Sequence, residues 1–201
     1  MTLRTTALLC LAILTTLPGG ARAAASEDPD WPCIQRLVPR ISAAQVWAGP
    51  EPDPAAWQGD IEVSRLASKL AARRTPLDEA ETLIETFVEA QPSETVNVKL
   101  TALFGRTLQV INQDRASLVA GIKRFAARQR SLAERIRETR AKLREADEPT
   151  PDEADLRELL TWDLRIFDER EKSMTYLCEQ PVLLEQRAFA LGRSIYFFVE
   201  D

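Results

Sequence analysis

The chain contains no histidine, and this absence decides most of the chemistry that its side chains can perform. Histidine triads, histidine general bases, haem ligation by histidine and most zinc and copper sites are excluded. The sequence also has no Cys-x-x-Cys pair for redox work and no glycine-rich phosphate loop. Carboxylates are plentiful, with 31 acidic residues, but carboxylates on exposed helices are mostly solvated. We therefore predict that the protein is not an enzyme, with no catalytic residues, no cofactor and no metal site.

Three cysteines are present, and their positions predict both a compartment and a bond. Cys10 lies in a segment with the pattern of a cleaved signal peptide: Arg4, an apolar core at 7–17, and Ala21-Arg22-Ala23 before the cleavage point. The apolar core is too short to remain as a membrane anchor, so we predict a periplasmic protein without stable membrane insertion. Removal of residues 1–23 leaves Cys33 and Cys178, which exported proteins usually pair. We predict a Cys33–Cys178 disulfide.

Two oppositely charged stretches lie on either side of a predicted turn. Residues 123–144 hold nine basic residues, a pattern that by itself resembles a nucleic-acid or phospholipid surface. Residues 152–171 hold eight acidic residues against three arginines, and a turn between them brings the two stretches face to face. No aromatic residues alternate with the arginines to stack on bases, and the net charge of the chain is −5. We predict that the charges set the register of a helical pair and that the protein binds no nucleic acid.

The predicted turn is itself acidic. Its carboxylates belong to Glu145, Asp147, Glu148, Asp152, Glu153 and Asp155. Such oxygens suit a hard cation such as calcium, but the stretch lacks the alternating acids and the glycine of a calcium loop. Acidic residues also stabilise the start of the helix that follows. We therefore interpret this segment as a solvated turn, with metal-ion binding as the alternative.

An arm rich in proline and tryptophan, residues 24–59, precedes the helices. Six prolines prevent a long helix, and one short helix is compatible with residues 34–47. Trp31, Trp47 and Trp57 argue against disorder, because disordered segments are poor in aromatic residues. Their rings either fill grooves between helices or form a surface that stacks on sugars or docks a partner. We favour the first interpretation.

The longest element is a helix predicted over residues 93–146. Apolar residues recur at steps of four and three, from Leu100 through Ile111 to Leu143, as in a coiled coil. Successive steps of four from Asp114 to Ile122 form a stutter, which locally unwinds a supercoil. At 1.5 Å per residue the helix would be roughly 75 Å long, which a compact domain does not need.

The remaining elements are predicted to pack on this helix. Asp60 caps a helix over 60–73; Thr75, followed by Pro76, caps a second over 77–91, and Ser93 caps the long helix. After a turn near 147–151, with a capping box formed by Thr150 and Glu153, a return helix runs back, kinked or broken at Pro181. We predict an all-α fold within residues 60–201: a long antiparallel helical hairpin, coiled-coil-like, supported at one end by two shorter helices and the N-terminal arm.

Four irregularities of this hairpin fall at the same level. An antiparallel register places Cys178 opposite Ala120, where the stutter falls. Gly121 next to it leaves room for a crossing segment, and Pro181 follows Cys178 by one turn. Beyond this level we predict a protruding two-helix tip of roughly 40 Å. Two helices alone cover a broad apolar stripe poorly, which leaves a candidate partner surface. Its residues are Leu159, Trp162, Ile166 and Phe167.

These features favour a non-catalytic function. We predict an exported helical scaffold, an adaptor or chaperone-like factor, whose coiled-coil hairpin contacts an exported protein or a second copy of the chain. The alternative function is that of a periplasmic small-ligand or metal-ion binding protein, which would use the arm or the acidic turn.

Overall fold

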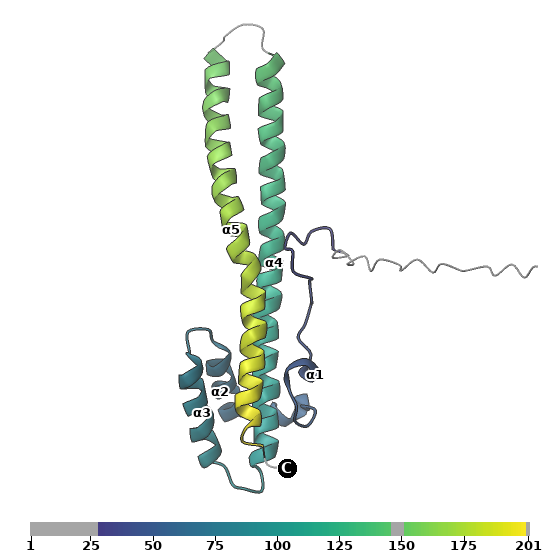
Figure 1. Cartoon of the computed structure of the whole chain (residues 1–201), viewed down its shortest axis with the longest axis vertical. Helices are drawn as coiled ribbons and strands as arrows, with labels where there is room; N and C mark the ends of the chain where they lie inside the picture. Colours follow the sequence, from purple (N-terminus) through teal and green to yellow (C-terminus); the bar gives the residue numbers. More distant parts are fainter. Residues whose placement is uncertain (1–27, 146–150, 200–201) are drawn as a thin grey trace, which may run out of the picture.

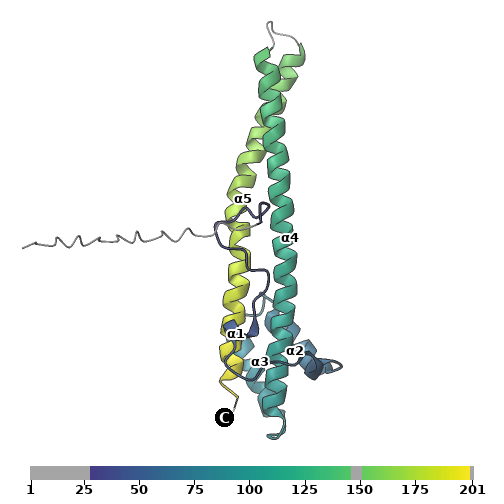
Figure 2. The ribbon, with the colours of Figure 1, turned by 90° about the vertical axis from the view of Figure 1, so that its right-hand side faces the viewer.

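The computed structural model describes residues 28–145 and 151–199. Within these ranges the chain forms helices and loops and no strand. The elements are α1 (Ala43–Val46), η1 (Pro54–Trp57), α2 (Ile61–Ala71), α3 (Leu77–Glu89), α4 (Val96–Glu145) and α5 (Pro151–Tyr196). Helices α4 and α5 lie side by side as a long antiparallel hairpin, and α2 and α3 flank its lower end (Figures 1 and 2). The all-α hairpin with two shorter supporting helices is confirmed. The predicted turn and its capping box at Thr150 involve residues outside the described ranges.

Helix starts follow the predicted capping at α2 and differ from it at α3 and α4. Asp60 Oδ1 accepts the backbone N–H of Val63 at 3.0 Å, so Asp60 is the predicted cap of α2. Helix α3 begins after Pro76, which holds the cap position and has no side-chain acceptor, so Thr75 is not the cap. Helix α4 begins three residues after Ser93, the predicted cap, since the backbone N–H groups of Thr95 and Val96 both donate to the Pro92 carbonyl.

Helix α5 continues through Pro181, so of the two predicted alternatives, a kink or a break, the break does not occur. A proline inside a helix removes one backbone hydrogen bond and costs about 3 kcal/mol. Here Gln180, Pro181 and Leu184 are all buried, and packing on both sides of the proline keeps the chain helical. The side-chain amide of Gln180 also donates to the Tyr176 carbonyl at 3.0 Å in the preceding turn.

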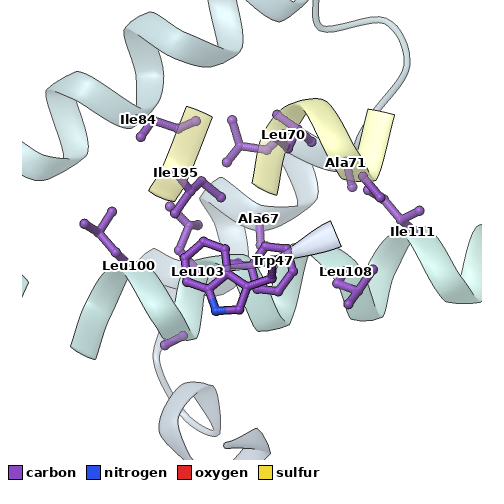
Figure 3. Packing of buried hydrophobic residues seen from close by; sticks show 14 of the residues in the cluster. Trp47, Ala67, Leu70, Ala71, Ile84, Leu100, Leu103, Leu108, Ile111 and Ile195 are labelled. Atoms are coloured by element: carbon purple, nitrogen blue, oxygen red, sulfur yellow. The ribbon is translucent and has the colours of Figure 1, made fainter. Parts of the chain in front are cut away.

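A single large apolar core lies at the lower end of the hairpin. Its buried residues come from the arm, from α2 and α3, from α4 as far as Ile111, and from α5 from Leu184 onward (Figure 3). Leu70, Leu103 and Ile195 at its centre have no exposed surface. Higher in the hairpin, the large apolar side chains of α4 that are buried belong to Ile122, Leu132 and Ile136. The molecule therefore consists of a packed base and a two-helix tip.

The arm lies along the hairpin rather than away from it (Figure 2). Trp31, Trp47 and Trp57 are each less than a tenth exposed, and Trp47 stacks on Phe104 with ring centroids 4.2 Å apart. Each indole N–H has an acceptor, and the three acceptors are the carbonyls of Gln35 and Pro50 and the side-chain oxygen of Gln109. The tryptophans fill grooves, as favoured from the sequence, and are not an exposed stacking surface. The helix allowed over 34–47 is reduced to α1, with Ile34 fully exposed.

Candidate partner surface at the hairpin tip

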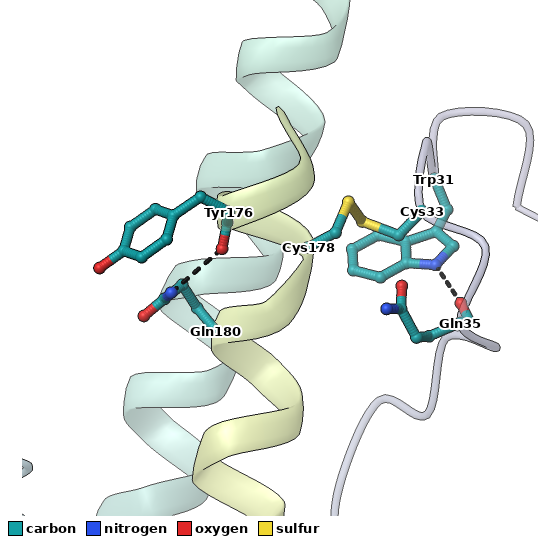
Figure 4. Close-up of a disulfide and its surroundings, with 6 residues drawn as sticks. All are labelled: Trp31, Cys33, Gln35, Tyr176, Cys178 and Gln180. Carbon is teal, nitrogen blue, oxygen red and sulfur yellow. Dashed lines mark hydrogen bonds between the residues drawn. A yellow bond between two sulfur atoms is a disulfide. The ribbon is translucent and has the colours of Figure 1, made fainter. Parts of the chain in front are cut away.

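A disulfide fixes the arm to α5 at the boundary between base and tip. Cys33 and Cys178 are bonded with Cα atoms 5.6 Å apart, across 145 residues of sequence. The ring of Trp31 lies beside the bond (Figure 4). The predicted pairing is confirmed.

Buried polar residues of α4 hold the arm by its backbone. The side-chain amide of Asn112 accepts the N–H of Ile41 and donates to its carbonyl, both at 2.9 Å, much as a neighbouring β-strand would. Arg115 donates to the Val38 carbonyl one turn further along. The sequence analysis missed both residues. Their spacing could have predicted that they are buried, because they follow Leu108 by four and seven residues and so lie on the same buried face of the helix.

The upper part of the arm is held by charge. Lys123 pairs with Asp28, and Arg130 Nη2 lies 2.7 Å from Asp30 Oδ1. The hydrogen bond from Lys123 holds the pKa of Asp28 below its ordinary value. Burial lowers the pKa of Arg115, although Glu185 on α5 opposes the shift. The arm thus occupies one flank of α4 from the base to the level of Arg130.

Among the ion pairs of the described residues, one crosses the hairpin between the two charged stretches, so the predicted pairing is found there and not along most of their length. Arg135 donates Nε and Nη2 to the two carboxylate oxygens of Asp163, at 2.7 and 2.6 Å. The Asp163 carboxylate is almost fully buried, and the hydrogen bonds from Arg135 lower its pKa. Three further ion pairs in the tip stay within one helix. They are Glu134–Arg137, Glu153–Arg157 and Glu169–Lys172. Lys123 and Arg130 instead form ion pairs with Asp28 and Asp30 of the arm, and the charge pattern did not predict these pairs.

The hairpin register follows from its cross-helix contacts. Arg135 lies opposite Asp163, and the amide of Gln129 donates to the Phe167 carbonyl at 2.9 Å. The same register continued along the helices places Cys178 at the level of Ala120, as expected. The crossing segment proposed beside Gly121 is absent from the described residues, since a Cβ there would meet nothing nearer than Arg124 at 3.9 Å. The close approaches are instead at Gly105, under Trp57 and Pro52, and at Gly192, against the Val46 carbonyl.

Three of the four candidate surface residues form an exposed row on one flank of α5. Leu159, Trp162 and Ile166 are 43%, 54% and 38% exposed, at the i, i+3, i+7 spacing of one helix face. The guanidinium of Arg165 lies 6.0 Å from the centre of the Trp162 ring. A shallow groove of about 480 Å³ runs from Trp162 past Ile166 to Ser173. We call Leu159, Trp162 and Ile166 the tip row.

Phe167, the fourth candidate, differs from the other three. Its side chain is half-buried, and its backbone carbonyl receives Gln129 from α4. Phe167 therefore belongs to the seam between the helices, and its predicted place in the exposed surface needs this correction. Tyr176, which the sequence analysis did not select, is 62% exposed further along α5.

Two further observations concern the described ranges 28–145 and 151–199. They hold no group of three or more acidic or cysteine side chains arranged to bind a metal ion. The acidic turn lies partly outside these ranges. Within them, no helix combines the length and the apolar character needed to cross a membrane.

The chain matches no protein-family model, no curated protein and no solved structure.

Proposed function

We propose that the protein is a non-catalytic adaptor or chaperone-like factor whose hairpin tip contacts another exported protein through the tip row. The observation that carries the proposal is the exposure of Trp162 between Leu159 and Ile166, on a helix that continues into a well-packed core. Tryptophan is enriched at the centre of protein interfaces because its ring buries a large area at a small entropic cost.

The division of the molecule supports this function. The base holds the core, so side chains on the flank of the tip are not needed to fold it. Loss of the tip row should therefore impair binding and leave stability nearly unchanged, which is the property of an interface residue.

We further propose that the protein works in the periplasm. Support comes from the signal-peptide pattern of residues 1–23, which lie outside the described ranges, and from the Cys33–Cys178 bond, which is typical of an oxidising compartment.

The double variant Trp162→Glu/Ile166→Glu tests the tip row. We expect an unfolding free energy within about 0.5 kcal/mol of the wild type, as for exposed positions. We also expect loss of the complex that the wild type forms, either with a periplasmic protein or with itself, as measured by light scattering of the purified species. The matched control, Asp168→Lys/Glu171→Lys, changes two exposed residues on the other side of the same helix and should keep the complex. Global unfolding of the Trp162 variant would place these residues in an ordinary core.

A second candidate function, small-ligand binding by the arm, is favoured by one observation. A groove of about 460 Å³ lies between the arm and α4, bordered by Arg40, Glu51, Trp57 and Gln109. A shift in melting temperature caused by a small molecule, and lost in Arg40→Ala, would favour this function over the adaptor.

A further inference from the structure

A third groove lies at the end of the molecule opposite the tip, between α3 and the end of α5, which pack together at the base (Figure 1). Its volume is about 690 Å³, larger than either groove described above. Its apolar lining comes from Leu77, Ala190, Phe197 and Phe198. Phe197 is 82% exposed and meets Phe198 edge to face, with centroids 5.2 Å apart. An aromatic side chain this exposed beside an apolar groove is typical of a binding surface.

One wall of this groove is strongly acidic. Asp78, Glu81 and Glu85 line it from α3, spaced so that all three point along the same side of the helix. Helix α3 as a whole carries five acidic residues and no basic one. Among the described residues that line the groove, one is a cation, Arg193, and its guanidinium lies 5.1 Å from the centre of the Phe189 ring. Three carboxylates against one guanidinium leave the groove with a net negative charge.

A groove with apolar residues beside a row of carboxylates favours an occupant that carries both apolar and basic side chains. An amphipathic helix places apolar residues at i, i+3, i+4 and i+7 and can carry lysines and arginines along both edges of that face. The carboxylates from Asp78 to Glu85 span about 10 Å, which matches two turns of such a helix. A neutral or acidic apolar segment would leave the carboxylates partly desolvated without a partner, which costs free energy.

The tip row of a second copy fits this groove less well than a wholly basic face would. Asp155, Glu158 and Glu169 lie on the same side of α5 as the tip row and would meet the groove's carboxylates, whereas Arg165 and Arg170 supply the basic charge there. We infer that the groove between α3 and α5 binds a basic amphipathic helical segment of a partner protein. This site is distinct from the tip row, and it gives the molecule one binding surface at each end.

A synthetic peptide tests the inference without knowledge of the natural partner. The probe is a fluorescent peptide of about 14 residues with leucines at i, i+3, i+4 and i+7 and lysines on both sides of that face. Fluorescence anisotropy with the full mature chain should show saturable binding that weakens as salt is added. Glu81→Lys/Glu85→Lys should weaken binding about tenfold or more, because like charges then face each other across the groove. Phe197→Ser should also weaken binding while the protein stays folded, since this ring is mostly solvent-exposed.

Matched controls separate this site from general attraction to an acidic protein. Glu158→Lys/Glu171→Lys makes the same change of net charge on α5, far from the groove, and should bind the peptide as the wild type does. A peptide of the same composition with scrambled leucines should bind at least about tenfold more weakly. Equal weakening in the two charge variants, or no binding by the wild type, would overturn the inference. Self-association of the wild type that Phe197→Ser abolishes would also overturn it, because a second copy would then be the occupant.

Discussion

At the scale of single residues, the arm depends on polar side chains that α4 keeps inside the protein. Asn112 is 7% exposed and satisfies both backbone groups of Ile41. We predict that Asn112→Ala destabilises the protein by about 2–3 kcal/mol, because two buried backbone groups lose their partners. Gln113→Ala, one residue further along on the exposed side of α4, should change the unfolding free energy by less than about 0.5 kcal/mol. Equal effects of the two substitutions in urea unfolding would contradict this account of the arm.

Two glycines of α4 give a second test at this scale. A Cβ at Gly105 would lie 2.4 Å from the Trp57 ring, whereas a Cβ at Gly121 would have open space around it. We predict that Gly121→Ala stabilises the protein by about 0.5–1 kcal/mol through helix propensity. Gly105→Ala should destabilise it by about 1–3 kcal/mol, because Trp57 or Pro52 must move. Thermal unfolding of the two variants decides this, and the same sign for both would be inconsistent with the packing of the arm.

At the scale of elements, the two helices of the tip are joined by the Arg135–Asp163 ion pair. Because the folded protein lowers the pKa of Asp163, this carboxylate stabilises the fold above its unfolded pKa of about 4. That contribution is lost as the pH falls through the lowered pKa. We predict that Asp163→Asn is less stable than the wild type at pH 7. The difference should shrink as the pH falls below about 4 and be smallest below the lowered pKa of Asp163, where both side chains are neutral.

Urea unfolding of the two proteins across this pH range measures the effect. Asp168→Asn, a change at an exposed position of the same helix, is the control and should differ little from the wild type at any pH. A stability difference for Asp163→Asn that does not depend on pH would show that the carboxylate's charge is not what matters.

The disulfide fixes one element, the arm, to another. Closing a loop across 145 residues contributes up to about 5 kcal/mol in the chain-entropy account. We predict that reduction, or Cys33→Ser/Cys178→Ser, lowers stability by several kcal/mol at most and increases amide exchange in the arm before that in α4 and α5. Hydrogen exchange followed by mass spectrometry resolves the order. A uniform increase across all helices would instead make the bond a support of the whole bundle.

The sequence predicted those parts of the fold that depend on short-range patterns. The apolar repeat of α4 and the Asp60 cap act between residues close in the chain. The partners of Asn112 and Arg115, and the pairing of Lys123 with Asp28, could not be predicted in this way, because each depends on where the arm lies. The continuation of α5 through Pro181 also depends on tertiary packing, which outweighs a local helix-breaking tendency.

For the candidate partner surface, the periodicity of α5 distinguished an apolar face from a polar face. It did not show which residues of the apolar face meet α4 and which meet solvent. Phe167 lies on the side that meets α4, while Trp162 lies on the side that meets solvent. The two residues are five positions apart and similar in chemistry. Only the register of the hairpin distinguishes them.

At the scale of the whole molecule, a folded base carries a protruding two-helix tip. Nearly all large fully buried side chains of the described residues belong to the base, and the tip row lies on a helix held by a narrow seam. We propose that this row contacts a specific protein in the compartment where the chain works.

Site-specific photo-crosslinking at position 162, in the cells that naturally make the protein, tests this claim most directly. A photoreactive phenylalanine analogue replaces Trp162, and the same analogue at Asp168, exposed on the other side of the same helix, is the control. We predict one discrete adduct from position 162 that disappears when Ile166→Glu is added and that the Asp168 control does not reproduce. The absence of any adduct at position 162, or identical adducts at both positions, would contradict the account.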